Sequence, residues 1–253
     1  MGWNRIFSLR RLACAVAVAL PLASAAEDVR VVTISQPDTL AYAFAERWLG
    51  LICQTAKLTC TLEYVPSDRA VYGMRSGQFD AEFGRGQDFP SGHPDAGYLL
   101  VNVPYFEISW RAVVRVDDKP PARWEEFKGS PLRVGVQRGI LTLERRLREY
   151  PPSVPLFEFT DLTQCLDMMS RRRLDVCMIY YPGALPAVPA AIKGDWRIGP
   201  SLESHLIYPF VTGHKPELVN LLGEASAKLA KQGENRRLLD EVLAPYADIL
   251  PGH

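Results

Sequence analysis

Short strand-like runs alternate with helix-like runs through most of this chain, from residue 30 onward. The first half contains "RVVTIS", an amphipathic helix, "TLEYV" and then a helix capped by Ser67. The second half repeats the pattern with "RVGVQ", a helix over 140–150, "LFEF", a helix with a capping box from Asp161 to Gln164, and "DVCMIYY". This alternation predicts an α/β fold with largely parallel sheets.

One strand-to-helix junction, "RVGVQRGILTLERRL", has a glycine where the helix opens. The first amides of a helix lack intrahelical partners and lie at the positive end of its dipole, so such a junction can receive an anion. It is not a P-loop, because no Gly-Lys-Ser/Thr follows, and with only Gly135 and Gly139 it is not a dinucleotide fingerprint. The junction is a candidate binding element, and the alternative is a tight turn only.

Two segments of the chain resemble each other. "MRSGQFDAEFGR" at 74–85 and "MSRRRLDVCMIY" at 169–180 share a Met at a helix end, an apolar residue before an Asp, and a strand after it. The shared acids are Asp80 and Asp175. The similarity is consistent with two lobes, each built from the same strand–helix unit.

The first 25 residues have the features of a secretory signal peptide. Arginines precede the apolar run "LACAVAVALPLA", which is followed by "ASA", so we expect cleavage before Ala26. The apolar run is too short to span a membrane, and no later run approaches the required length. The sequence therefore predicts a soluble protein exported to the periplasm.

Charge and motif content exclude several classes of function. The chain has 29 basic and 29 acidic residues, and the signal peptide holds three arginines and no acid, so the mature net charge is about −3. Neither nucleic acid nor an anionic membrane is indicated as a partner. The four histidines are not spaced as metal ligands, and no GxSxG, HExxH or CxxC occurs. We therefore expect no metal, no cofactor and no catalytic residues.

Four cysteines remain in the mature chain, an even number that suggests two disulfides in an oxidising compartment. Cys53 lies near a helix end and Cys60 opens the next strand. Cys165 lies on a helix and Cys177 on the strand that follows it. Measured along the helix and along the strand, the two residues are at similar distances from the turn between them. We therefore predict the local pairs Cys53–Cys60 and Cys165–Cys177, and the alternative is four buried free thiols.

Several segments, in the expected order, resemble the bacterial periplasmic solute-binding proteins of the type II fold, which include the amino-acid-binding subunits of ABC importers. They are "RSGQFDAEFGRG", "VNVPYFEISWRAVVRV", "WEEFKGSPLRVGVQRGI", "SRRRLDVCMIYYP" and "HKPELVNLLGEASAKLAKQGENRRLLDE". The resemblance implies two α/β lobes, 26–110 with 209–253 and 111–208, joined by hinge strands "SWRAVV" and "LIYPFV". The lobes would close around a ligand between them.

The function that this resemblance implies is capture of a small polar or anionic ligand by a monomeric periplasmic protein that delivers it to an inner-membrane ABC permease. Two alternatives remain open. One is a free sensor module that partners a receptor, and the other is an enzyme on the same fold, such as a dehydratase.

Ligands of open α/β sheets bind beyond the carboxyl ends of the strands. Gln36 follows the first strand, and Arg85 and Tyr180 each stand five residues after the acids of the internal repeat. We therefore expect Arg85 and Tyr180 to face each other across the cleft. Arg85 offers a planar fork suited to a carboxylate or phosphate, and its alternative role is structural or solvated.

The resemblance also assigns roles to residues of the second lobe. Family members that bind amino acids usually have an Asp where Tyr180 stands, and that Asp pairs with the ligand's ammonium. Tyr180 supplies no such charge, so an ordinary α-amino acid is in doubt as the ligand. Gly139 matches the family's glycine at the helix start, and Arg138 or Thr142 would replace the hydroxyl that usually follows it.

Aromatic residues approach the first hinge strand. Tyr105 and Trp110 are candidates for one wall of the cleft. The alternative for each is a place in the core, where large aromatic side chains are commonly buried.

Overall fold

The structure is a computed structural model, which describes residues 28–138, 140–149, 155–184 and 195–245. The expected signal peptide, its cleavage site before Ala26, and Gly139 lie outside the described residues. In the part of the chain that is described, no helix is both long enough and apolar enough to cross a membrane.

The first lobe combines the N-terminal elements with the C-terminal helices. They are β1 (Asp28–Thr33), α1 (Leu40–Ala56), β2 (Thr59–Tyr64), α2 (Ser67–Ser76), β3 (Ala81–Gly86), the 3-10 turns η1 (Phe89–Gly92) and η2 (Pro94–Ala96), β4 (Tyr98–Leu100), α6 (Glu217–Lys231) and α7 (Glu234–Leu243).

The second lobe is formed by the middle of the chain. Its elements are η3 (Trp124–Phe127), β6 (Val134–Gln137), α3 (Leu141–Arg148), β7 (Leu156–Phe159), α4 (Leu162–Ser170), β8 (Val176–Tyr181) and β9 (Trp196–Ile198). Two ten-residue strands, β5 (Phe106–Arg115) and β10 (Glu203–Thr212), run between the lobes. The expected lobe boundaries, after 110 and after 208, fall inside these two strands.

The strands form a single sheet whose order along its main path is β2-β1-β3-β10-β5-β8-β6-β7. Pairing is parallel within each lobe, between β1, β2 and β3 and between β6, β7 and β8. It is antiparallel wherever β10 or β5 takes part. In the described part of the sheet, the two parallel units are therefore linked through the crossing pair.

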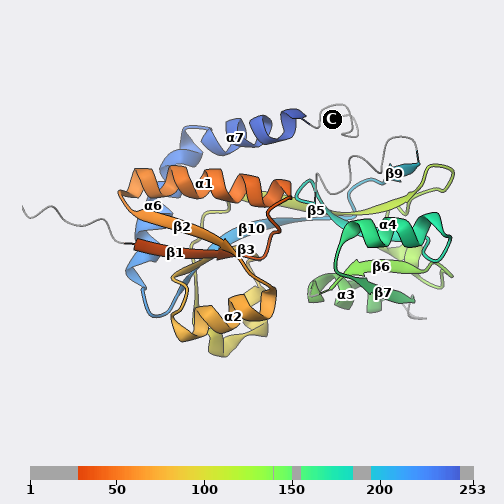
Figure 1. The fold of residues 1–253 in the computed structure, drawn as a ribbon, viewed down its shortest axis with the longest axis horizontal. Coiled ribbons are helices and arrows are strands. Elements are labelled where there is room, and N and C mark those ends of the chain that lie inside the picture. The colour runs from red at the N-terminus through yellow and green to blue at the C-terminus, as the bar shows by residue number, and fades with distance from the viewer. Residues whose placement is uncertain (1–27, 139, 150–154, 185–194, 246–253) are drawn as a thin grey trace, which may run out of the picture.

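Helices cover both faces of the sheet in each lobe (Figure 1). On one face, the apolar residues of α1, α4, α6 and α7 belong to one buried cluster that continues across both lobes. On the other face, the side chains under α3 and those under α2 form two separate clusters. The core is thus continuous on the first face and interrupted between α2 and α3 on the second, where polar side chains lie at the strand ends.

The internal repeat seen in the sequence is a repeat of structure. The Asp80 carboxylate accepts the Arg30 amide at 2.8 Å, and the Asp80 amide donates to the Arg30 carbonyl. In the second lobe, Asp175 makes the same two backbone bonds with Arg133, at 2.9 Å each. Each Asp therefore ties the strand that follows it to the strand beside it.

The pH dependence of stability should reveal the pair formed by Arg133 and Asp175. Hydrogen bonds from Arg133 hold the pKa of Asp175 at about 2, below its ordinary value of 3.8. A lowered pKa stabilises the fold above about pH 4, and this contribution is lost as the pH falls towards 2. We expect Asp175→Asn to unfold more easily than wild type at pH 7. In urea titrations, the difference should shrink between pH 4 and 2, and a constant difference would contradict the assignment.

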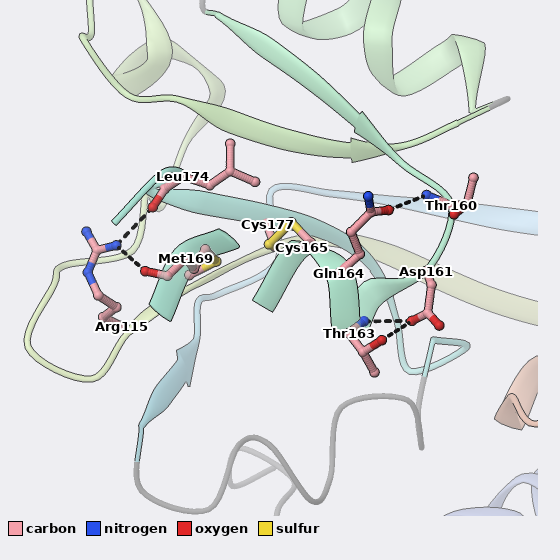
Figure 2. The surroundings of a disulfide bond; sticks show 9 residues. All are labelled: Arg115, Thr160, Asp161, Thr163, Gln164, Cys165, Met169, Leu174 and Cys177. Atoms are coloured by element: carbon pink, nitrogen blue, oxygen red, sulfur yellow. Dashed lines mark hydrogen bonds between the residues drawn. A yellow bond between two sulfur atoms is a disulfide. The ribbon is translucent and has the colours of Figure 1, made fainter. Parts of the chain in front are cut away.

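Both expected disulfides are present, and each lies within one lobe. Cys53 joins Cys60, and Cys165 joins Cys177. Figure 2 shows the second bond, which links α4 to β8. Nearby, Asp161 caps α4 by accepting from the Thr163 amide.

The other partner in the expected capping box behaves differently. The Gln164 side chain accepts from the amide of Thr160, one residue before the cap, at 3.4 Å (Figure 2). At the far end of α4, the Arg115 side chain donates to the carbonyls of Met169 and Leu174. This helix is therefore anchored at both ends as well as by its disulfide.

Gly135 on β6 lies directly beneath the second disulfide. A Cβ atom built on Gly135 would stand 2.3 Å from the Cys165 sulfur and 3.0 Å from a methyl of Leu174. Such distances are too short for real contacts, so a side chain here would force α4 away from the sheet.

We predict that Gly135→Ala lowers the free energy of unfolding by about 1–3 kcal/mol, the usual effect of overpacking a core. The matched control is Gly50→Ala on α1, because a Cβ there meets nothing within 4 Å. Alanine is the better helix former, so the control should be neutral or slightly stabilising. Chemical denaturation with the disulfides intact would test both, and equal stabilities would contradict the prediction.

Candidate functional site

The carboxyl ends of strands from both lobes converge on the middle of the crossing pair. The end of β3, Gly86, is level with Ile207 on β10, and the end of β8, Tyr181, is level with Ser109 on β5. Ser109 is in turn paired with Ser204. Because Ile207 and Ser204 are three residues apart, the two strand ends lie about 10 Å from each other along β10. This convergence defines the candidate site.

A bulge near the end of β3 decides where Arg85 points. Gly84 has a φ of +123°, and the pairing of β3 with β10 shifts register between Tyr208 and Pro209. The extra residue breaks the alternation of the strand, so Arg85 lies on the same face as Glu82. Glycine suits this place because other residues rarely adopt such a φ.

Arg85 is the centre of a buried polar network in the first lobe. Its Nε donates to Glu82 at 2.6 Å, and a terminal nitrogen donates to the Ser67 hydroxyl at 3.1 Å. The Phe89 ring lies over its guanidinium at 3.9 Å, and Tyr98 donates to the other oxygen of Glu82. Only 5% of the Arg85 side chain and none of that of Glu82 is exposed.

The phenols beside this network stay protonated. Burial, and then the charge of Glu82, raise the pKa of Tyr98 and of Tyr105. A neutral Tyr98 can therefore donate to Glu82 throughout the physiological range of pH.

Ser67 does not cap α2 as its sequence suggested: it is the first helical residue, and Pro66 holds the cap position without a side-chain bond.

The strand register places Arg85 and Tyr180 well apart. Arg85 is level with Tyr208, whereas Tyr180 is level with Trp110, which pairs with Glu203. The two levels are five residues apart on β10, or about 17 Å. Together with its contacts to Glu82 and Ser67, this separation favours the structural alternative for Arg85.

Removing the Arg85 side chain should therefore affect folding first. Arg85→Ala leaves a buried carboxylate without its cation, which typically costs about 3–5 kcal/mol. The matched control is Arg69→Ala in the same lobe, because the Arg69–Glu63 pair is exposed and such pairs contribute little. Urea unfolding of the ligand-free proteins would compare them. An Arg85→Ala variant as stable as wild type would return Arg85 to the ligand-binding candidates.

Tyr180 is the next-to-last residue of β8, and its phenol lies near Asp38, Thr39 and Tyr64 of the first lobe. Burial is the main cause that raises the pKa of Tyr180 to about 12, followed by the charges of Asp38 and Tyr64, while the Thr39 side chain lowers it. Tyr180 is therefore a neutral hydrogen-bonding group at the junction of the lobes.

The two other aromatic candidates are buried. Trp110 is 7% exposed, and its ring meets that of Tyr180 edge-on, with centroids 6.5 Å apart. Tyr105 is 6% exposed and packs between Phe44 and Phe83. Trp110 thus packs edge-on against the Tyr180 ring. The surroundings of Tyr105 favour the alternative role for this residue, which is a place in the hydrophobic core.

The start of α3 is the candidate of the second lobe for binding an anion. The first intrahelical donors, Leu143 and Glu144, bond to the Ile140 carbonyl, so the amides of Leu141 and Thr142 precede the hydrogen-bonded ladder. Thr142 is exposed.

Arg138 lies just before that helix start but turns away from it. Its Nε donates to Glu158 on β7 at 3.0 Å, in an exposed ion pair. The expected role for Gly139 concerns a residue outside the described part of the chain.

Sequence reasoning found Gln36 at this junction but missed its neighbours Asp38, Thr39 and Tyr64. The Thr39 hydroxyl donates to the Gln36 carbonyl at 2.6 Å and accepts from the Tyr42 amide, so it caps α1. A Thr before an amphipathic helix is a recognisable cap signal. The position of Tyr64 at the end of β2 was a second signal, since strand ends gather at the site.

Comparison with known proteins was made at the level of sequence and of structure. No protein-family model and no curated protein matches the sequence. Solved structures do match the fold. The arginine-, lysine-, histidine-binding protein ArtJ from Geobacillus stearothermophilus is 16% identical, with a TM-score of 0.65 over 86% of this chain and 96% of its own.

Sensor domains match equally well. The VFT2 domain of BvgS from Bordetella pertussis, solved as a double mutant, is 18% identical, with a TM-score of 0.66 over 85% of this chain and 92% of its own. A histidine kinase sensor domain described as similar to periplasmic binding proteins is 15% identical, with a TM-score of 0.69 over 86% and 96%.

These comparisons establish the fold. The chain has the two-lobed α/β architecture of type II periplasmic solute-binding proteins, as the sequence resemblance implied. The solved structures named here are an amino-acid-binding protein and two sensor domains.

Proposed function

We propose that this protein binds a small polar or anionic molecule between its lobes and delivers it to an inner-membrane ABC importer. The observation that carries the proposal is the convergence of strand ends from both lobes at the middle of β5 and β10. In this fold class a ligand held there touches both lobes, so that binding and hinge closure are coupled.

The chemistry of Tyr180 supports the choice of ligand class. An ammonium group needs a carboxylate or a cage of acceptors, whereas Tyr180 is a neutral phenol with a pKa of about 12. The first amides of α3, at Leu141 and Thr142, add donors and a positive dipole end. The phenol and these amides are hydrogen-bond donors, which favours an acidic or neutral polar group in the ligand.

Four of the predicted residues belong to this proposal. Tyr180 and Gln36 would line the cleft from opposite lobes, and Thr142 with Gly139 would hold the ligand's acidic group at the helix start. Arg138 would have to leave Glu158 to join them, which costs little for an exposed pair.

The cellular setting is proposed on the same basis. The apolar leader, the even number of cysteines and the two disulfides support export of a monomer to the periplasm. A free sensor module is the alternative function, and the matches to BvgS and to a histidine kinase sensor domain favour it specifically.

A thermal-shift screen of the protein lacking residues 1–25 tests the ligand class. Candidates should include organic acids, amino acids, polyamines and oligopeptides. A ligand at 100 times its dissociation constant stabilises the native state by about 2.7 kcal/mol, so a binder is readily detected. We expect stabilisation by organic acids or neutral polar compounds, and stabilisation by polyamines alone would contradict the proposal.

The screen can be sharpened with Tyr180→Asp, which places a carboxylate where the phenol stands. Like charges in a binding site cost several kcal/mol, so an anionic ligand should bind at least about a hundredfold more weakly. Tyr72→Asp is the matched control, because that tyrosine is 59% exposed on α2. Calorimetry that finds equal losses for both variants would place the ligand elsewhere.

A further inference from the structure

A backbone hydrogen bond joins the two lobes directly. The amide of Ala41, in the first turn of α1, donates to the carbonyl of Gly183, just after β8, at 3.1 Å. First-turn amides have no intrahelical acceptor, so one of the four free donors of α1 is satisfied by the opposite lobe. A carbonyl oxygen also complements the positive end of the helix dipole.

A side-chain contact lies beside this bond. Tyr180 belongs to the same turn as Gly183, because its carbonyl accepts the Ala184 amide at 2.8 Å. The Tyr180 phenol lies near the Thr39 side chain, which caps the same end of α1. The turn after β8 therefore holds the start of α1 through the backbone bond, and the Tyr180 phenol stands beside the helix cap.

The fit at this contact depends on Gly183 having no side chain. A Cβ built there would lie 2.7 Å from the Tyr180 ring and 3.3 Å from the Ala41 Cβ. Gly183 is not among the residues with a positive φ, so its backbone conformation does not require glycine. The requirement comes first from the Tyr180 ring in the same turn, and the contact with Ala41 across the lobes adds to it.

The two lobes carry net charges of opposite sign, which attract the lobes to each other over longer distances. Residues 111–208 contain 15 basic and 12 acidic residues, a net charge of +3. The rest of the chain after residue 25 contains 11 basic and 17 acidic residues, a net charge of −6. Salt screens such attraction beyond about 8–10 Å, so it assists the closure rather than fixing it.

We propose that the Ala41 amide and the Gly183 carbonyl form a latch that keeps the lobes closed in the absence of ligand. The resting state is then closed, and a ligand gains access only when the turn after β8 separates from α1. This inference concerns the ligand-free protein and goes beyond the proposed function, so it can be tested whether or not a ligand is found.

Amide exchange of Ala41 reports the latch directly. By NMR, the Ala41 amide should be protected in the ligand-free protein, and Gly183→Ala should speed its exchange at least tenfold by preventing the contact. The Tyr42 amide, which donates to Thr39 within the first lobe, is the internal reference and should change little. The matched control is Gly92→Ala, because a Cβ there meets nothing within 4 Å.

Small-angle scattering of the same ligand-free proteins gives the second readout. Wild type and Gly92→Ala should have the same radius of gyration, and Gly183→Ala should be larger. If Gly183→Ala does not fold, scattering of Ala41→Pro decides, because proline is tolerated in the first turn of a helix and removes the amide that donates to Gly183, so this variant should be larger than wild type. An unprotected Ala41 amide in wild type, or variants that match wild type in exchange and scattering, would overturn the proposal.

Discussion

The antiparallel pairing of β5 with β10 is the constraint on which the rest of this structure depends. Residues 106–110 pair with 203–207, and among the described strands this short ladder links the β3 side of the sheet to the β8 side. The β3 strand pairs with one end of β10, and β8 pairs with the far part of β5. This offset brings the carboxyl ends of strands from both lobes to the same level and thereby creates the site.

Two local features, an Arg–Asp unit in each lobe and a bulge in the first lobe, modify this shared arrangement of strands. The Arg–Asp unit, formed by Arg30 with Asp80 and by Arg133 with Asp175, aligns the inner strands of each lobe in the same way. The bulge at Gly84 occurs in the first lobe and turns Arg85 into its own network. The repeat therefore accounts for the shared fold, and the bulge accounts for the different roles of Arg85 and Tyr180, which occupy equivalent places in sequence.

Features that depend on neighbours in sequence could be predicted. The α/β alternation, the repeat around Asp80 and Asp175 and the pairing of Cys53 with Cys60 all follow from local periodicity and short loops. The partners of Arg85 could not, because Glu82 reaches it only through a bulge set by the register with β10. Nor could Ala41 be linked to Gly183, since that contact depends on how the lobes are placed.

The latch and the ligand site share a turn, and this has an energetic consequence. Tyr180 and Gly183 belong to the turn after β8, so a ligand that uses the Tyr180 phenol enters only when that turn has left α1. If the open state is one part in a hundred, the apparent affinity of a ligand that enters it falls a hundredfold. For an importer such a latch sets the ligand concentration at which loading begins. For a sensor, such a latch sets the conformation that the receptor contacts before any ligand binds, which is then the closed form.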